Sequence, residues 1–164
     1  MTNETKARFW IVIVMIGLVI SGVTAFPLLY ELNLLAEFFA TDQGGLDPSK
    51  YNGLAHWIMK VREGLDVTYA TYPFVAYGTD WLAFGHLVIA LFFILPFREP
   101  TRYAGVLTIG IWASLAVIPF ALVCGPIRQI PFYWRLIDCS FGILCIPPLF
   151  IARRFAVRSK TGET

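Results

Sequence analysis

Four long apolar stretches dominate this sequence and limit what it can fold into. A helix needs roughly 20 apolar residues to cross about 30 Å of hydrocarbon, and the predicted spans cover residues 9–30, 78–97, 103–125 and 131–152. The chain of 164 residues is 57% hydrophobic and only 15% charged, with a mean hydropathy of +0.66. Soluble domains carry more charge, so we expect residues 1–164 to form a single integral membrane domain.

The predicted fold is all-α, a four-helix transmembrane bundle with an extracytoplasmic segment at residues 31–77 between the first two spans. In this segment a helical stripe continues the first span as far as Phe39, and Asp47 followed by Pro48 is typical of a helix start. Apolar residues then recur at helical spacing, at Leu54, Ile58, Val61 and Leu65. We therefore expect one or two amphipathic helices on the outer membrane surface.

The fourth apolar stretch cannot cross the bilayer without charged residues. Only residues 139–152 are free of charge, and at about 1.5 Å per residue they reach only about 21 Å. The fourth helix is therefore predicted to begin near Pro131 and to carry Arg135 and Asp138 into the membrane.

Basic residues predict the orientation of the four spans. They precede the first span, fill the turn between the second and third, and follow the fourth: Lys6, Arg8, Arg98, Arg102, Arg153, Arg154, Arg158 and Lys160. The positive-inside rule makes this side cytoplasmic, with both termini inside, as in a bacterial inner membrane protein. Most acidic residues, Asp42 among them, lie on the other side, so the net charge of +2 does not indicate nucleic-acid binding.

Ionisable residues are predicted to lie at one depth of the outer half of the membrane. His86 and Asp138 each fall roughly 10 Å below the outer interface at the helical rise, and Asp80 and Arg135 lie slightly nearer the surface. A charged side chain at the bilayer centre costs about 2.5 to 3.5 kcal/mol on insertion scales. We therefore expect these groups to face inward and to pair, Arg135 with Asp138 along one helix, or Arg128 or Arg135 with Asp80.

Two interpretations of these polar residues stay open. In the functional one they form a polar pocket that opens outward, with His86, Asp138 and Asp80 as candidate catalytic or proton-carrying groups. Arg128, Arg135, Tyr133 and Trp134 are the candidate ligand-binding residues of the same pocket. In the structural one the charges only lock the helices together.

The sequence favours a binding function over catalysis. The pocket would bind a lipid-like or quinone-like ligand, membrane lipids or a partner membrane subunit. The alternatives are a small membrane enzyme that uses His86 and a carboxylate for acid–base chemistry on a lipid-soluble substrate, and an oligomeric transporter. Whether the chain is an enzyme, and which cofactor it uses, are left open. Small residues at helical spacing predict close helix approach and a homo-oligomer or larger complex: Gly17, Ser21, Ala25, Gly110 and Ser114.

Sequence motifs for other functions are missing. No H-E-x-x-H pattern, phosphate-binding loop or dinucleotide-binding glycine motif is present, so no metal ligands are predicted. Cys124, Cys139 and Cys145 form no C-x-x-C pair and are expected to be buried apolar residues.

Overall fold

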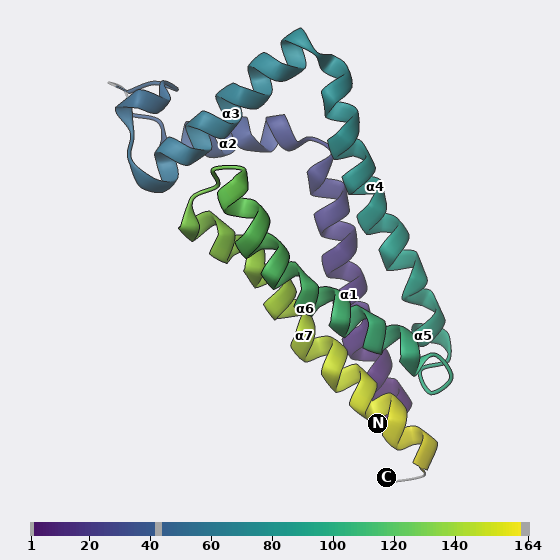
Figure 1. The fold of residues 1–164 in the computed structure, drawn as a ribbon. Helices are drawn as coiled ribbons and strands as arrows, with labels where there is room; N and C mark the ends of the chain where they lie inside the picture. The colour runs from purple at the N-terminus through teal and green to yellow at the C-terminus, as the bar shows by residue number, and fades with distance from the viewer. Residues whose placement is uncertain (1, 42–43, 162–164) are drawn as a thin grey trace. The chain divides into compact units, whose positions relative to one another are not determined.

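The computed structural model describes residues 2–41 and 44–161, and every regular element in them is a helix. Asp42 and the last residues of the tail, 162–164, lie outside the described residues. The α-helices are α1 (Asn3–Ala25), α2 (Leu28–Phe39), α3 (Gly53–Thr71), α4 (Ala76–Phe92), α5 (Ile94–Arg98), α6 (Ala104–Ile127) and α7 (Phe132–Thr161) (Figure 1). Short 3-10 turns, η1 (Pro48–Lys50) and η2 (Pro73–Val75), precede α3 and α4.

Four helical segments are long and apolar enough to cross a membrane, which confirms the predicted number of spans: Asn3–Ala25, Pro73–Arg98, Ala104–Ile127 and Phe132–Ser159. The first span ends earlier than predicted because Pro27 separates α1 from α2. The fourth begins at Phe132 and carries Arg135 and Asp138 as predicted, but it continues well beyond residue 152. The run of apolar residues stops at charged residues such as Arg153, but the helix continues.

Contacts within the chain form two compact units, and each is described by itself. Unit 1 comprises Met1–Leu18 and Val88–Thr164, and unit 2 comprises Val19–Leu87.

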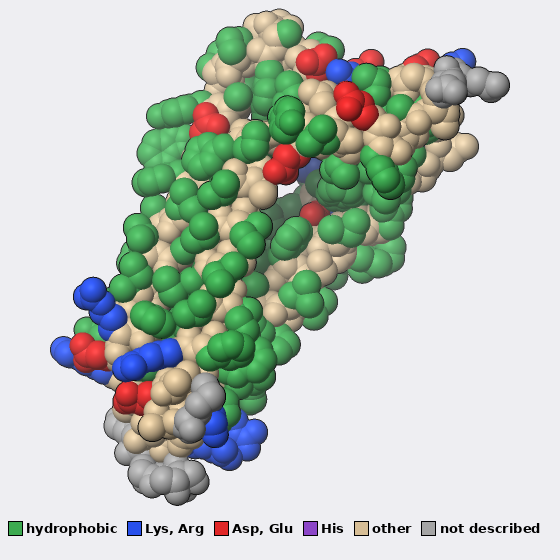
Figure 2. All heavy atoms as spheres, turned by 180° about the vertical axis from the view of Figure 1, so that it is seen from behind, with side chains coloured by type: hydrophobic (Ala, Val, Ile, Leu, Met, Phe, Trp, Pro, Cys, Tyr) green, Lys and Arg blue, Asp and Glu red, His purple; other side chains and the backbone are tan. Residues whose placement is uncertain are grey.

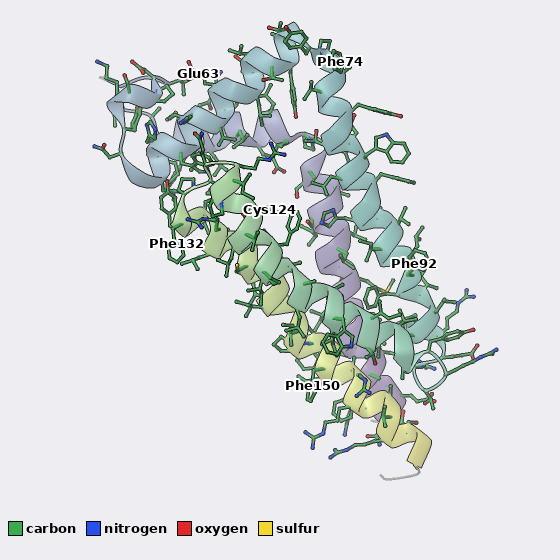
Figure 3. All side chains as sticks on the ribbon, in the orientation of Figure 1. Glu63, Phe74, Phe92, Cys124, Phe132 and Phe150 are labelled. Atoms are coloured by element: carbon green, nitrogen blue, oxygen red, sulfur yellow. The ribbon has the colours of Figure 1, made fainter. Side chains whose placement is uncertain are left out.

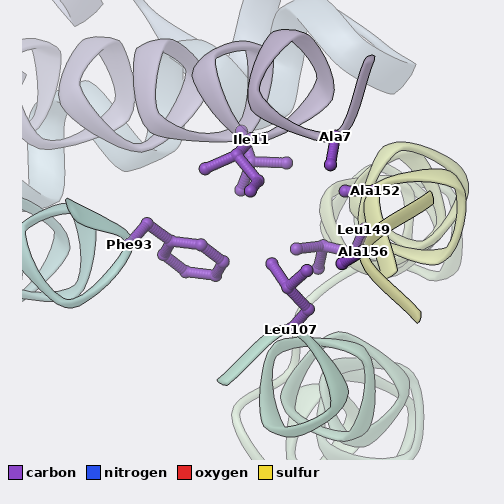
Figure 4. Packing of buried hydrophobic residues seen from close by; sticks show 8 residues of the cluster. Ala7, Ile11, Phe93, Leu107, Leu149, Ala152 and Ala156 are labelled. Carbon is purple, nitrogen blue, oxygen red and sulfur yellow. The ribbon is translucent and has the colours of Figure 1, made fainter. Parts of the chain in front are cut away.

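The core of unit 1 is a small apolar cluster where α1, α6 and α7 meet around Phe93 (Figure 4). Its buried members are Ala7, Ile11, Val14, Phe93, Leu107, Leu149, Ala152 and Ala156. The alanines let the helix backbones approach, and Gly110 leaves room for the Phe93 ring, whose Cζ would lie 3.1 Å from an added Cβ. The cluster therefore fixes the first turns of α1 against the long pair α6 and α7.

Glycines mark the closest helix approaches, and only some were predicted. In unit 1 a Cβ on Gly142 of α7 would run into the backbone oxygen of Ser114, which lies on the predicted small-residue stripe of α6. For α1 no described helix of the chain approaches closely at Gly17, since an added Cβ would meet no atom within 4 Å, and a contact there with a second copy stays a prediction. The close approach in unit 2 is at Gly22, where an added Cβ would lie 2.9 Å from the Ala83 carbonyl oxygen of α4.

Unit 2 contains the helix pair α2 and α3, which pack through a core of Ala36, Ile58 and Met59. Arg62 of α3 ties the pair further, because its Nε donates to Asn33 Oδ1 of α2 at 2.7 Å. The placement of this pair on the membrane surface, and the four-helix bundle itself, stay predictions.

The predicted helix start at Asp47 opens only the short turn η1. The Asp47 carboxylate accepts hydrogen bonds from the Ser49 hydroxyl (2.7 Å) and amide (2.9 Å), and these bonds lower the pKa of Asp47 below its usual value. Tyr51 and Asn52 are then extended, so the α-helix begins only at Gly53.

Large apolar side chains cover much of the outer surface of the spanning helices (Figure 2). Phe92 of α4 and Phe150 of α7 are among the exposed ones (Figure 3). Exposed apolar surface on this scale is unusual for a soluble protein but is what helices that face lipid require.

The approach of α7 to the α6 backbone predicts that Gly142→Ala destabilises unit 1. The added methyl group meets backbone, which cannot rotate away, so we expect a loss of about 1–3 kcal/mol in the free energy of unfolding. Unfolding in detergent, followed by circular dichroism, measures it. Gly105→Ala on α6 is the matched control, since its Cβ meets nothing within 4 Å. Equal stability of the two variants would contradict the described packing.

Candidate functional site

The predicted site residues divide between the two units. Asp80 and His86 lie on α4 in unit 2, whereas the remaining ones lie in unit 1 at the end of α6 or in the first turns of α7: Arg128, Tyr133, Trp134, Arg135 and Asp138. Each group is therefore considered with the unit that holds it, and one pocket formed by all of them stays a prediction.

Arg135 is held by apolar and aromatic contacts. Its guanidinium carbon lies 5.2 Å from the centre of the Phe132 ring, a cation–π distance. Its methylene stem lies against α6 where Gly125 has no side chain, since a Cβ there would collide with the Cγ and Cδ of Arg135. Among the residues that the structure describes, none forms a hydrogen bond with the buried Nε of Arg135. Gly125 therefore makes the room that lets a charged side chain pack at this depth.

Asp138 is half-buried one turn after Arg135, yet the two do not form the ion pair that their spacing predicts. Within residues 2–41 and 44–161 the ion pairs join Glu4 to Arg8, Arg62 to Asp66, and Glu99 to Arg102. The stem of Arg135 turns toward α6 and the Phe132 ring, and this direction takes its charge away from the carboxylate.

His86 is half-buried on α4, and its Nδ1 lies 2.8 Å from the carbonyl oxygen of Leu82 in the same helix. A carbonyl only accepts, so neutral His86 carries its proton on Nδ1 and leaves Nε2 as the acceptor. Asp80 precedes His86 by six positions, which is about 240° around a helix. The two side chains thus leave α4 on different faces, and acid–base chemistry by the pair stays a prediction.

The remaining predicted ligand-binding residues lie around the turn between α6 and α7. Arg128 is exposed and caps α6, where its amide donates to the carbonyls of Cys124 and Gly125. Gln129 follows with a positive φ of 58°. Tyr133 is exposed and Trp134 is half-buried at the start of α7.

A hollow in unit 2, which we call the aromatic hollow, contains one of the predicted residues. Its volume is about 270 Å³, and its walls are Phe26, Tyr77, Asp80, Trp81 and Phe84. Phe26 comes from the break after α1, and the other four share one face of α4. The rings of Tyr77 and Trp81 meet edge to face at 5.9 Å, and those of Trp81 and Phe84 at 5.8 Å.

Among the described residues that line the aromatic hollow, Asp80 is the charged one, and the surface of the wall itself is almost wholly apolar. Within the part of the chain that the structure describes, no hydrogen bond or ion pair engages its carboxylate. A carboxylate among aromatic faces can bind a cation or a hydroxyl group while the rings hold an apolar body.

The aromatic members of this wall were missed as binding residues by sequence reasoning. Tyr77 and Trp81 are typical of residues that anchor a helix at the membrane interface. The useful signal was their spacing, because Tyr77, Trp81 and Phe84 follow at i, i+4 and i+7 with Asp80 on the same stripe. Phe26 gives no such signal, since only the break of the chain at Pro27 brings it to α4.

No group of three His, Cys, Asp or Glu side chains lies close enough to hold a metal ion in residues 2–41 and 44–161. The free cysteines lie on α6 and α7: Cys124, Cys139 and Cys145. Cys139 is buried, with its sulfur 3.9 Å from the carbonyl oxygen of Ile118.

The missing ion pair on α7 predicts that substitutions of Arg135 and Asp138 act independently. We expect the effects of Arg135→Gln and Asp138→Asn on the free energy of unfolding to add within about 0.5 kcal/mol, as they do for residues without a shared contact. A double-mutant cycle in detergent measures this. A coupling energy above about 1 kcal/mol would show that the two charges do pair.

Comparison with known proteins finds no matching family model, no similar curated protein and no similar solved structure.

Proposed function

We propose that this integral membrane protein binds a lipid-soluble amphiphile in the aromatic hollow, with Asp80 holding the polar head of the ligand. The observation that carries the proposal is the wall of the hollow, where Phe26 and three aromatic rings of the spanning segment Pro73–Arg98 form an almost wholly apolar surface beside Asp80. Rings of this kind suit an apolar tail, and the carboxylate supplies the one strong polar contact that fixes its orientation.

The hydrogen-bonding capacity of Asp80 limits which ligand heads fit the site. A carboxylate in a membrane span is costly to leave without a partner, and none engages it within the described residues. An ionised carboxylate only accepts hydrogen bonds, so the best ligand head is one that donates, such as a hydroxyl or an ammonium group. A quinone carbonyl only accepts and would need Asp80 protonated, so a lipid-like ligand fits better than a quinone-like one.

The walls of the hollow also support entry from the lipid. Tyr77 and Trp81 are 61% and 57% exposed, so the site lies open to whatever surrounds α4. An amphiphile can then enter sideways from the bilayer without an opening motion of the helices. Membrane partner subunits, transport, and catalysis by His86 stay predictions beside this one.

The basic residues give the proposed orientation. The basic residues at the start of α1 and in the turn between α5 and α6 put these segments on the cytoplasmic side. Both termini are then inside, and residues 26–77 lie outside. The aromatic hollow then opens to the outer leaflet, beneath α2 and α3 as amphipathic outer helices. The short basic turns suit a bacterial inner membrane.

Removal of the Asp80 charge is predicted to release the ligand. Hydrogen bonds to charged groups contribute about 1.5–3 kcal/mol, so Asp80→Asn should lower the occupancy of a co-purifying amphiphile at least about tenfold. Native mass spectrometry of gently solubilised protein measures that occupancy. Glu63→Gln is the control, because Glu63 is an exposed carboxylate of α3 outside the hollow. Equal occupancy in both variants would remove Asp80 from the site.

The aromatic wall gives a second expected outcome. Trp81→Ala and Phe84→Ala should each weaken ligand retention, because each removes a ring that contacts the apolar body. Phe92→Ala is the matched control, since Phe92 is an equally exposed ring of α4 outside the hollow. The same extraction experiment compares them. If Phe92→Ala loses as much ligand, the binding is general lipid adhesion.

The proposed orientation predicts that a reporter active only in the cytoplasm works at one position and a reporter active only outside works at another. Green fluorescent protein fused after Ser159 should fluoresce, and alkaline phosphatase inserted after Lys50 should be active, because only the second position lies outside. Reporter activity in whole bacterial cells is the measurement. A dark green fluorescent protein after Ser159 together with an inactive phosphatase after Lys50 would contradict the orientation.

A further inference from the structure

A second hollow lies in unit 1 and is polar where the first is aromatic. Its volume is about 560 Å³, and we call it the arginine hollow because three arginines line it. The lining residues are Glu4, Arg8, Arg98, Glu99, Thr101 and Arg102. The first turns of α1, the end of α5 and the turn that leads to α6 supply these residues. The hollow therefore lies where three spanning segments begin or end.

The charges around the arginine hollow leave one arginine in excess. Arg8 pairs with Glu4 at 3.4 Å, and Arg102 pairs with Glu99 at 3.2 Å. Arg98 has no ion pair in the portion of the chain that the structure describes. Basic side chains gather around this end of unit 1, where the described chain begins and ends (Figure 2). A single negative charge would complete the set of pairs.

Two donors in the wall have no acceptor among the described residues. Arg8 gives its Nη2 hydrogen to the carbonyl oxygen of Arg98 at 3.1 Å, but no described group accepts from its buried Nε. The buried hydroxyl of Thr101 likewise has no partner in this part of the chain. Buried donors of this kind are rare in folded proteins and are costly to leave unmet. An anion with several acceptor oxygens in the hollow would give both a partner once the two side chains turn from their covered positions toward it.

The turn that carries Arg98 and Thr101 is held by its own contacts. Pro96 and Pro100 are fully buried, and the amides of Glu99 and Tyr103 donate to the carbonyls of Leu95 and Glu99. A backbone fixed in this way lowers the entropy cost of ordering this part of the site on binding.

We propose that the arginine hollow binds the phosphate group of an anionic phospholipid headgroup. Guanidinium groups match phosphate geometry, and basic pockets between spanning helices on the cytoplasmic side suit anionic headgroups. The ends of the spans put the hollow at the depth where such headgroups lie. This site shares no residue with the aromatic hollow and does not depend on it.

The test compares lipids bound to purified protein by native mass spectrometry in detergent. Phosphatidylglycerol and phosphatidylcholine with the same acyl chains are the probes, and inorganic phosphate is the competitor that separates a lipid from a free anion. We expect the natural protein to retain phosphatidylglycerol preferentially, and inorganic phosphate to displace it only weakly.

Two variants separate the hollow from a general basic surface. Arg98→Gln should reduce phosphatidylglycerol binding about fivefold. One basic residue at a membrane surface contributes about 1 kcal/mol to binding, which corresponds to this change in affinity. Thr101→Val keeps the shape and the charge, and it should reduce binding about tenfold because the hydroxyl donor is lost. Arg154→Gln removes a positive charge from the exposed end of α7 outside the hollow and should leave binding unchanged.

Three results would overturn the proposal. They are equal binding of the two lipids by the natural protein, the same loss in Arg154→Gln as in Arg98→Gln, and unchanged binding in Thr101→Val. Tight binding of inorganic phosphate with no lipid preference would overturn the assignment to a lipid.

Discussion

Hydrocarbon offers no hydrogen bonds, and this one constraint shapes the whole chain. Nearly every backbone amide and carbonyl in a span must find its partner within the same helix, so the four candidate spans are long helical segments. Apolar side chains can face outward because lipid is as apolar as they are, as Phe92 and Phe150 do. Polar side chains then carry most of the information about function, because each is costly inside a span unless it has a purpose or a partner.

The polar residues meet that constraint in different ways. Arg135 lays its stem in the space left by Gly125 and its charge over the Phe132 ring. His86 bonds a carbonyl of its own helix. Asp80 instead lies in the wall of the aromatic hollow, and Arg8 and Thr101 keep buried donors in the wall of the arginine hollow. Both proposed ligand sites thus contain polar groups that the described residues leave without a partner.

Sequence reasoning found the spans and missed most of the packing, for physical reasons. Hydrophobicity is a property of each segment alone, so windows of about 20 apolar residues identify four membrane helices without any tertiary information. Register is a property of two helices together. The i, i+4 pattern therefore predicts Gly17 as a contact when the α4 backbone in fact approaches Gly22. For the same reason spacing alone predicts that Arg135 pairs with Asp138, but Gly125 on another helix decides where that side chain goes. Asp80 is recognised from its charge, whereas Tyr77 and Trp81 are equally typical of aromatic residues at the membrane interface.

Photo-crosslinking from within the aromatic hollow shows whether an amphiphile binds there. The photoreactive residue p-benzoylphenylalanine would replace Phe84 in the hollow or, as the control, Phe92, which is also an exposed ring of α4. Irradiation in native membranes, followed by mass spectrometry, identifies what each position touches. We expect one defined amphiphile with a hydroxyl or ammonium head at position 84 and a mixture of bulk lipids at position 92. The same lipid mixture at both positions would contradict specific binding in the hollow.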